Sequence, residues 1–164
     1  MTLPYPARLA DGDLVLRLST PDDVATITGW LADPAVHRWW GGEPVPAAEV
    51  RRKYCGAREP AVAVYVLEFA QDPVGLVQAW QDPDARGLDA FLAAGHQGRG
   101  LGPRAARLLA VDLLARGWRG LTVDPAVDNP RAQAAWRRAG FVPTGERGLD
   151  DGYETVLMEF RGEP

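Results

Sequence analysis

A glycine-rich segment near the middle of the chain is the strongest chemical signal in the sequence. The segment QGRGLG, from Gln97 to Gly102, follows a strand-like run and precedes a run with helical periodicity. Glycine lets a backbone turn with positive φ and approach a ligand closely, while the free N–H groups and dipole of a helix start attract anions. The segment therefore predicts a phosphate-binding turn, to which the adjacent Arg99 and Arg104 add positive charge.

The spacing of the glycines excludes two common nucleotide-binding loops. A Walker loop needs Lys followed by Ser or Thr after its last glycine, whereas the letters LGP follow Gly100. A dinucleotide-binding fingerprint has the spacing G-x-G-x-x-G, whereas Gly98, Gly100 and Gly102 are each two residues apart. The pattern instead resembles Q-x-x-G-x-G, the pyrophosphate loop with which the Gcn5-related N-acetyltransferase (GNAT) family binds coenzyme A.

Length and charge narrow the class of protein. The chain has 164 residues, the size of one domain, and we expect a single domain over residues 1–164. Lys and Arg total 18 against 22 Asp and Glu, which gives a net charge of −4. A nucleic-acid-binding protein usually has a basic excess, so the balance favours neutral or cationic partners and no nucleic acid.

Other kinds of site and segment are not expected. One cysteine and two distant histidines predict neither a disulfide framework nor a metal site. No apolar run approaches the roughly 18–20 residues that span a bilayer, so we expect no membrane partner. The N-terminus lacks the basic and apolar regions of a secretory signal, which favours a cytoplasmic protein.

Strand-like and helix-like patterns alternate along the chain and predict an α/β layered domain. The expected strands are 14–18, 61–69, 73–80, 86–94, 121–123, 141–144 and 153–160. The first expected helix begins at Thr20 and ends before Pro34. Three further helices are expected at 47–57, at 103 to about 116, and at 130–140. The glycine-rich segment then lies between the strand 86–94 and the helix that begins at Pro103.

Over nearly its whole length the chain resembles the GNAT family, and within it the aminoglycoside 6′-N-acetyltransferases. The stretches that carry the resemblance are WWGGE at 39–43, RGLDAFL at 86–92, GRGLG at 98–102 and the run from Val123 to Phe141. The resemblance implies a central mixed, mostly antiparallel sheet that is splayed at the acetyl-CoA site and flanked by helices. It implies an acetyl-CoA-dependent N-acetyltransferase that acts on a primary amine of a cationic small molecule, with an aminoglycoside 6′-amine first among the acceptors.

Asp89 interrupts an otherwise apolar strand, which favours a functional role for its carboxylate in acetyl transfer to an amine. Only a neutral amine attacks a thioester, so a carboxylate near the acceptor helps to remove a proton. The resemblance implies that Asp89 is this base. Because an ordinary aspartate has a pKa near 4, we expect Asp89 to be partly desolvated or to act through water. The single Cys55 makes a covalent acyl-enzyme improbable and favours direct transfer.

The resemblance also implies the residues that bind the coenzyme. A backbone N–H group of Phe91, Leu92 or Ala93 would stabilise the negative charge that forms on the thioester oxygen. The other residues implied in coenzyme binding are Gln97, Gly98, Arg99, Gly100, Leu101, Gly102, Arg104, Asn129 and Trp136.

For the acceptor, the resemblance implies a pocket of carboxylates and aromatic rings, which suit ammonium groups. Its residues would be Trp40, Glu43, Tyr54, Gln78 and Asp124, with Asp150 and Asp151 as weaker candidates. Of the tryptophan pair, we expect Trp39 to pack in the core.

Two departures from the family pattern keep alternatives open. Trp136 stands where the family often has a tyrosine that protonates the leaving thiolate, so it is expected to line the pantetheine site or the core. The connection 81–85 is shorter than in many aminoglycoside enzymes, which implies a more open acceptor site. The alternatives are acylation of a lysine-like amine in siderophore synthesis or on a protein, and a non-catalytic module that binds coenzyme A. The sequence also allows a homodimer.

Overall fold

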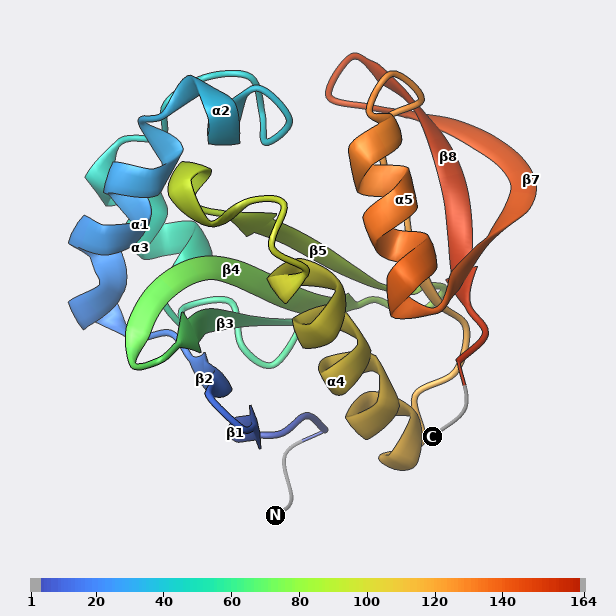
Figure 1. The fold of residues 1–164 in the computed structure, drawn as a ribbon, viewed down its shortest axis with the longest axis horizontal. Helices are drawn as coiled ribbons and strands as arrows, with labels where there is room; N and C mark the ends of the chain where they lie inside the picture. Colours follow the sequence, from blue (N-terminus) through green and yellow to red (C-terminus); the bar gives the residue numbers. More distant parts are fainter. Residues whose placement is uncertain (1–3, 163–164) are drawn as a thin grey trace.

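An eight-stranded sheet organises the molecule (Figure 1). The computed structural model describes residues 4–162. The strands are β1 (Arg8–Asp11), β2 (Leu14–Leu18), β3 (Val62–Phe69), β4 (Asp72–Gln81), β5 (Arg86–Leu92), β6 (Leu121–Val123), β7 (Phe141–Asp150) and β8 (Tyr153–Phe160). They lie in the order β1-β2-β3-β4-β5-β6-β8-β7, and every neighbouring pair is antiparallel except β5 and β6. The prediction of a mixed, mostly antiparallel sheet flanked by helices is confirmed.

Helices cover both faces of the sheet. They are α1 (Val24–Leu31), α2 (Pro34–His37), α3 (Ala47–Tyr54), α4 (Leu101–Ala115) and α5 (Pro130–Ala139). In β3 the alternate residues Ala63 and Tyr65 pack with α4, whereas Val62 and Val64 pack with α1 and α3. Side chains of a strand point alternately to its two faces, so a strand covered on both sides is apolar throughout.

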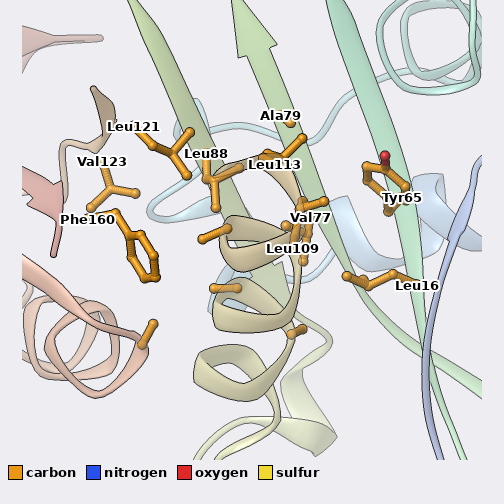
Figure 2. Close-up of a cluster of buried hydrophobic side chains, with 14 of the residues drawn as sticks. Leu16, Tyr65, Val77, Ala79, Leu88, Leu109, Leu113, Leu121, Val123 and Phe160 are labelled. Atoms are coloured by element: carbon orange, nitrogen blue, oxygen red, sulfur yellow. The ribbon is translucent and has the colours of Figure 1, made fainter. Parts of the chain in front are cut away.

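The larger core lies between α4 and the sheet (Figure 2). Leu109 and Leu113, one helical turn apart, point from α4 toward Val77 and Leu88 on the strands. Each of these four side chains is at most 1% exposed. This packing fixes the position of α4, and therefore of the glycine-rich segment that precedes it, relative to β5.

The sheet opens between β5 and β6. Only two residue pairs join these strands, Arg86 with Leu121 and Gly87 with Thr122. From Leu88 onward β5 pairs with β4 alone, and in Figure 1 the part of the sheet that contains β7 and β8 turns away from β5. The predicted splay is therefore present, at the strand that carries Asp89.

Several boundaries differ from the predictions. The first predicted helix is a 3-10 turn at Pro21–Asp23 that continues into α1, and its expected capping box at Thr20 is present. The second predicted helix ends at Tyr54 instead of residue 57, because Gly56 adopts a φ of +95°. The strand predicted at 141–144 extends to Asp150. Strand β1 and helix α2 were not predicted, since neither four-residue element is long enough to show a period.

No helix within residues 4–162 has both the length and the apolar character needed to cross a membrane.

Candidate active site

Two adjoining cavities occupy the opening between β5 and β6. One, of about 630 Å³, lies against the glycine-rich segment, and we call it the donor cavity. The other, of about 350 Å³, lies against the carboxylates, and we call it the acceptor pocket. The residues that line both are Trp39, Ala90, Asn129, Ala132 and Trp136.

The backbone of β5 presents free polar groups to the opening. The N–H group of Ala93 donates to the carbonyl of Val74 on β4, at 2.8 Å. Successive residues of a strand direct their N–H groups to opposite sides, so those of Leu92 and Ala90 point away from β4. Of the three residues expected to stabilise the oxyanion, Leu92 alone has its N–H group on the open side, because those of Phe91 and Ala93 face β4.

The glycine-rich segment forms the end of the donor cavity. Gly98 and Gly100 have φ values of +76° and +77°, which L side chains rarely adopt. A Cβ atom on Gly102 would lie 3.0 Å from Cδ2 of Leu92, so this position also favours glycine. No side chain caps the start of α4, and its first N–H groups remain available to an anion. These features fit a bound pyrophosphate.

Gln97 holds the segment in place. Its side-chain amide donates to the carbonyl of Leu92 at 3.1 Å and to that of Ala35 at 3.4 Å. It therefore links the turn to the end of β5 and to α2, while also lining the donor cavity.

The two arginines expected at the phosphates have other partners. Arg99 lies over the ring of Phe69, 5.5 Å from its centroid, and contacts His96. Arg104 pairs with the carboxylate of Asp11 at 3.3 Å. Neither lines the donor cavity, although Leu101 and the three glycines of the segment do.

The arginines that do line this cavity were not predicted from the sequence. They are Arg38, Arg131 and Arg138. The spacing of Arg131 and Arg138, seven residues or about two turns apart on α5, could have indicated a common helix face with Ala135.

Asn129 and Trp136 lie on the α5 side of the opening. The Oδ1 atom of Asn129 accepts a hydrogen bond from the N–H group of Ala132 at 3.2 Å and caps α5. Trp136 packs edge-on against Phe141, with ring centroids 5.2 Å apart, and lines both cavities. Trp136 therefore packs against the core and forms part of the cavity wall, and its place beside the pantetheine stays a prediction.

Asp89 lies in the acceptor pocket, on the last strand before the splay. It is opposite Gln78 on β4, whose amide donates to Oδ2 of Asp89 at 3.0 Å. Burial is the largest influence on Asp89 and raises its pKa; the Gln78 hydrogen bond opposes this rise, and the charge of Asp150 adds to it. The expected desolvation is thus present, and it makes Asp89 a better proton acceptor than an ordinary aspartate.

Further carboxylates surround the same pocket. Asp124 follows β6, and burial together with the charges of Asp89 and Asp150 raises its pKa to about 6. Asp150, the last residue of β7, and Asp151, in the turn that follows it, also line the pocket. Such a group of carboxylates attracts ammonium ions. Among residues 4–162, no group of three or more His, Cys, Asp or Glu side chains could hold a metal ion.

Aromatic side chains form the remaining wall. The indole N–H of Trp40 donates to the hydroxyl of Tyr54 at 2.8 Å, and Trp40 packs edge-on against Phe91. Trp39 instead packs at a tilt of 49° against Tyr153 of β8, with ring centroids 5.7 Å apart. The prediction that Trp39 is the core residue is wrong: it extends from the end of α2 toward the β7–β8 turn, while Trp40 packs against the core under α1 and α3.

Most of the predicted acceptor residues are therefore brought together. Trp40, Tyr54, Gln78, Asp89 and Asp124 line the acceptor pocket. Glu43 is exposed and does not line it. The pocket is also lined by Lys53, Trp39 and Tyr153, which were not predicted as acceptor residues.

Comparison with known proteins agrees with this geometry. A family model described as an acetyltransferase (GNAT) domain matches residues 19–149. Aminoglycoside N(6′)-acetyltransferase type 1 from Klebsiella pneumoniae is 30% identical over 172 residues, covering 93% of this chain and 85% of the relative. A solved structure of AAC(6′)-Ib with acetyl-CoA matches with a TM-score of 0.80 and 28% identity, over 90% of this chain and 93% of that one.

A second solved structure extends the comparison to an acceptor. It is AAC(6′)-Ib in complex with coenzyme A and kanamycin, with a TM-score of 0.78 and 27% identity. The match covers 89% of this chain and 93% of that one.

Proposed function

Because the chain belongs to the GNAT acetyltransferase family, we propose that it transfers the acetyl group of acetyl-CoA directly to the 6′-amine of an aminoglycoside. The observation that carries this proposal is the position of Asp89. It lies in an acidic, aromatic pocket, next to Ala90, which lines both cavities. A base is thus adjacent to the place where the donor and acceptor meet. The relatives named for aminoglycosides support the choice of acceptor.

The donor cavity would hold the coenzyme along β5. The uncapped start of α4 and the glycines of the loop suit its pyrophosphate. Acetyl-CoA supplies a thioester whose carbonyl carbon is open to attack by a neutral amine. The N–H group of Leu92, on the open side of β5, would donate to the thioester oxygen as negative charge develops there.

The acceptor pocket would bind and deprotonate the amine. Asp124, Asp150 and Asp151 attract the ammonium groups of a polyamine sugar, and the rings of Trp40 and Tyr54 provide faces for them. Asp89 takes the proton from the reacting amine, directly or through water. Trp136 cannot act as the acid that a tyrosine supplies in many relatives. A thiol has a pKa near 8.5, so the thiolate can leave without a side-chain acid.

A panel of acceptors tests the proposal. The purified protein is mixed with acetyl-CoA and, separately, with 6′-amino aminoglycosides, linear polyamines and lysine derivatives, and release of free thiol is measured. We expect the highest kcat/KM with the aminoglycosides. Faster turnover of lysine derivatives would show that the acceptor is a lysine-like amine and not an aminoglycoside. Thermal stabilisation by coenzyme A without turnover of any amine would favour a non-catalytic module that binds coenzyme A.

The single domain over residues 1–164, the homodimer and the cytoplasmic location stay predictions of the sequence.

A further inference from the structure

The donor cavity needs positive charge at one end. A pyrophosphate carries two negative charges, and guanidinium groups bind phosphate oxygens through paired, charge-assisted hydrogen bonds. Arg99 and Arg104 are nearest to the glycine-rich loop in the sequence. Since Arg99 lies over the ring of Phe69 and Arg104 pairs with Asp11, both guanidinium groups are directed elsewhere.

Arg131 reaches the loop from the opposite side of the opening. It is the second residue of α5, and a Cβ atom built on Gly98 would lie 3.5 Å from its Nη2 atom. The guanidinium is therefore in contact range of a loop glycine whose positive φ shapes the turn. Within residues 4–162 no carboxylate forms an ion pair with Arg131. A cation that lines a cavity without a counter-ion is available to an anionic ligand.

The other two arginines of the donor cavity are placed differently. Arg38 lies over the ring of Trp39, 4.9 Å from its centroid. Arg138 is seven residues beyond Arg131, which puts it about two turns, or roughly 10 Å, farther along α5. Arg131 is thus the member of this group that lies against the loop.

We propose that Arg131 binds the pyrophosphate of coenzyme A and supplies there the positive charge that the sequence pattern attributes to Arg99 and Arg104. The inference rests on the use of acetyl-CoA in the proposed function and adds a specific residue to it. In this arrangement the pyrophosphate lies between the amide groups of the loop and α4 on one side and the guanidinium from α5 on the other. Bound coenzyme would then connect the two parts of the splayed sheet.

Calorimetric titration with two ligands tests the assignment. Coenzyme A has a pyrophosphate and a 3′-phosphate, whereas dephospho-coenzyme A keeps only the pyrophosphate. We expect Arg131→Ala to weaken the binding of both ligands by about 10- to 100-fold and by similar factors. Arg137→Ala is the matched control, because Arg137 is an exposed arginine of the same helix that does not line the cavity, and its Kd values should match the wild type.

Three results would overturn the assignment. Unchanged affinity of Arg131→Ala for both ligands removes the contact. A loss with coenzyme A but not with dephospho-coenzyme A moves Arg131 to the 3′-phosphate. A larger loss from Arg99→Ala than from Arg131→Ala returns the role to the loop arginine.

The same titrations separate this inference from the proposed function. If the wild type binds neither ligand, the proposed function fails together with the inference. If the wild type binds both and Arg131→Ala binds them equally well, only the inference fails. Arg131 is exposed, so its variant is expected to keep the wild-type melting temperature, which confirms that the protein is folded.

Discussion

The donor cavity and the acceptor pocket share a wall but are built from different parts of the chain. On the donor side the main features are backbone features: the open edge of β5, two glycines with positive φ and the uncapped start of α4. On the acceptor side they are side chains from separate elements, with Asp89 on β5, Asp124 after β6 and Tyr54 on α3. The donor cavity therefore depends on particular backbone conformations, whereas single side-chain substitutions can change the ligand that the acceptor pocket binds.

The largest effect that separates the two regions is expected from Asp89→Asn. Loss of the base should lower kcat/KM by about 100-fold or more, while the Kd of coenzyme A stays the same because the donor cavity is intact. Steady-state kinetics and calorimetry measure the two quantities. Asp84→Asn, in the exposed turn before β5, is the control. An unchanged kcat/KM would remove Asp89 from the mechanism.

The second prediction is that Asp124→Asn weakens acceptor binding but stabilises the fold. Removing a charge-assisted contact should raise the Kd of a polycationic acceptor by about tenfold or more. The raised pKa of Asp124, about 6, means that the folded state binds more protons than the unfolded state between about pH 4 and pH 6. Ionisation of Asp124 therefore lowers stability as pH rises through this window.

The stability gain has a defined pH dependence. Asp124→Asn should increase the free energy of unfolding at pH 8, by less than about 1 kcal/mol because solvent reaches this residue, and leave it unchanged below about pH 4. Denaturant melts at the two pH values measure it. Asp128→Asn, exposed and outside both cavities, is the control. A loss of stability at pH 8 would contradict the assigned pKa direction.

The third prediction concerns the backbone of the donor cavity. Gly100→Ala should lower stability by about 1–2 kcal/mol and weaken coenzyme A binding, because Gly100 has a φ of +77°. The matched substitution Gly29→Ala lies in helix α1 with open space around it, and there alanine should stabilise by about 0.5–1 kcal/mol. Thermal melts and coenzyme titration compare the two variants. Equal effects would show that the left-handed conformation is not needed.

The smallest effect on activity is expected beside the acceptor pocket, where Tyr153 of β8 contacts the residues that follow α2. The hydroxyl of Tyr153 donates to the carbonyl of Arg38 at 2.7 Å, and its ring packs against that of Trp39. Tyr153→Phe removes only the hydrogen bond and should lower stability by about 0.5–1.5 kcal/mol with a small rise in acceptor KM. Tyr153→Ala also removes the ring contact with Trp39 and should raise KM further. Equal KM values for the two variants would show that this ring contact does not shape the pocket.

The sequence allowed the local backbone pattern of the site to be predicted further than the directions of the side chains around it. The glycine spacing, the strand before it and Asp89 within that strand are local patterns, and each occupies its predicted place. The direction of an arginine side chain is not determined by the local sequence. Arg99 and Arg104 adjoin the loop in sequence, but contacts with Phe69 and Asp11, which are distant in sequence, determine where their side chains point.

Long-range packing also explains the other errors. The direction of the chain after α2 determines which of Trp39 and Trp40 packs against the core. Two neighbouring tryptophans in a sequence do not reveal this direction. Strand β7 is exposed beyond Phe141, so it lacks the alternation of buried and exposed residues from which its length could be predicted.

Turnover of two matched acceptors tests directly whether the protein acetylates a 6′-amine. The pair are aminoglycosides that differ only in carrying an amine or a hydroxyl at the 6′ position, and release of free thiol from acetyl-CoA is followed with each. We expect thiol release with the 6′-amine and little with the 6′-hydroxyl, because Asp89 and the acidic pocket act on an amine. Equal rates with both, or no release with either, would contradict this expectation.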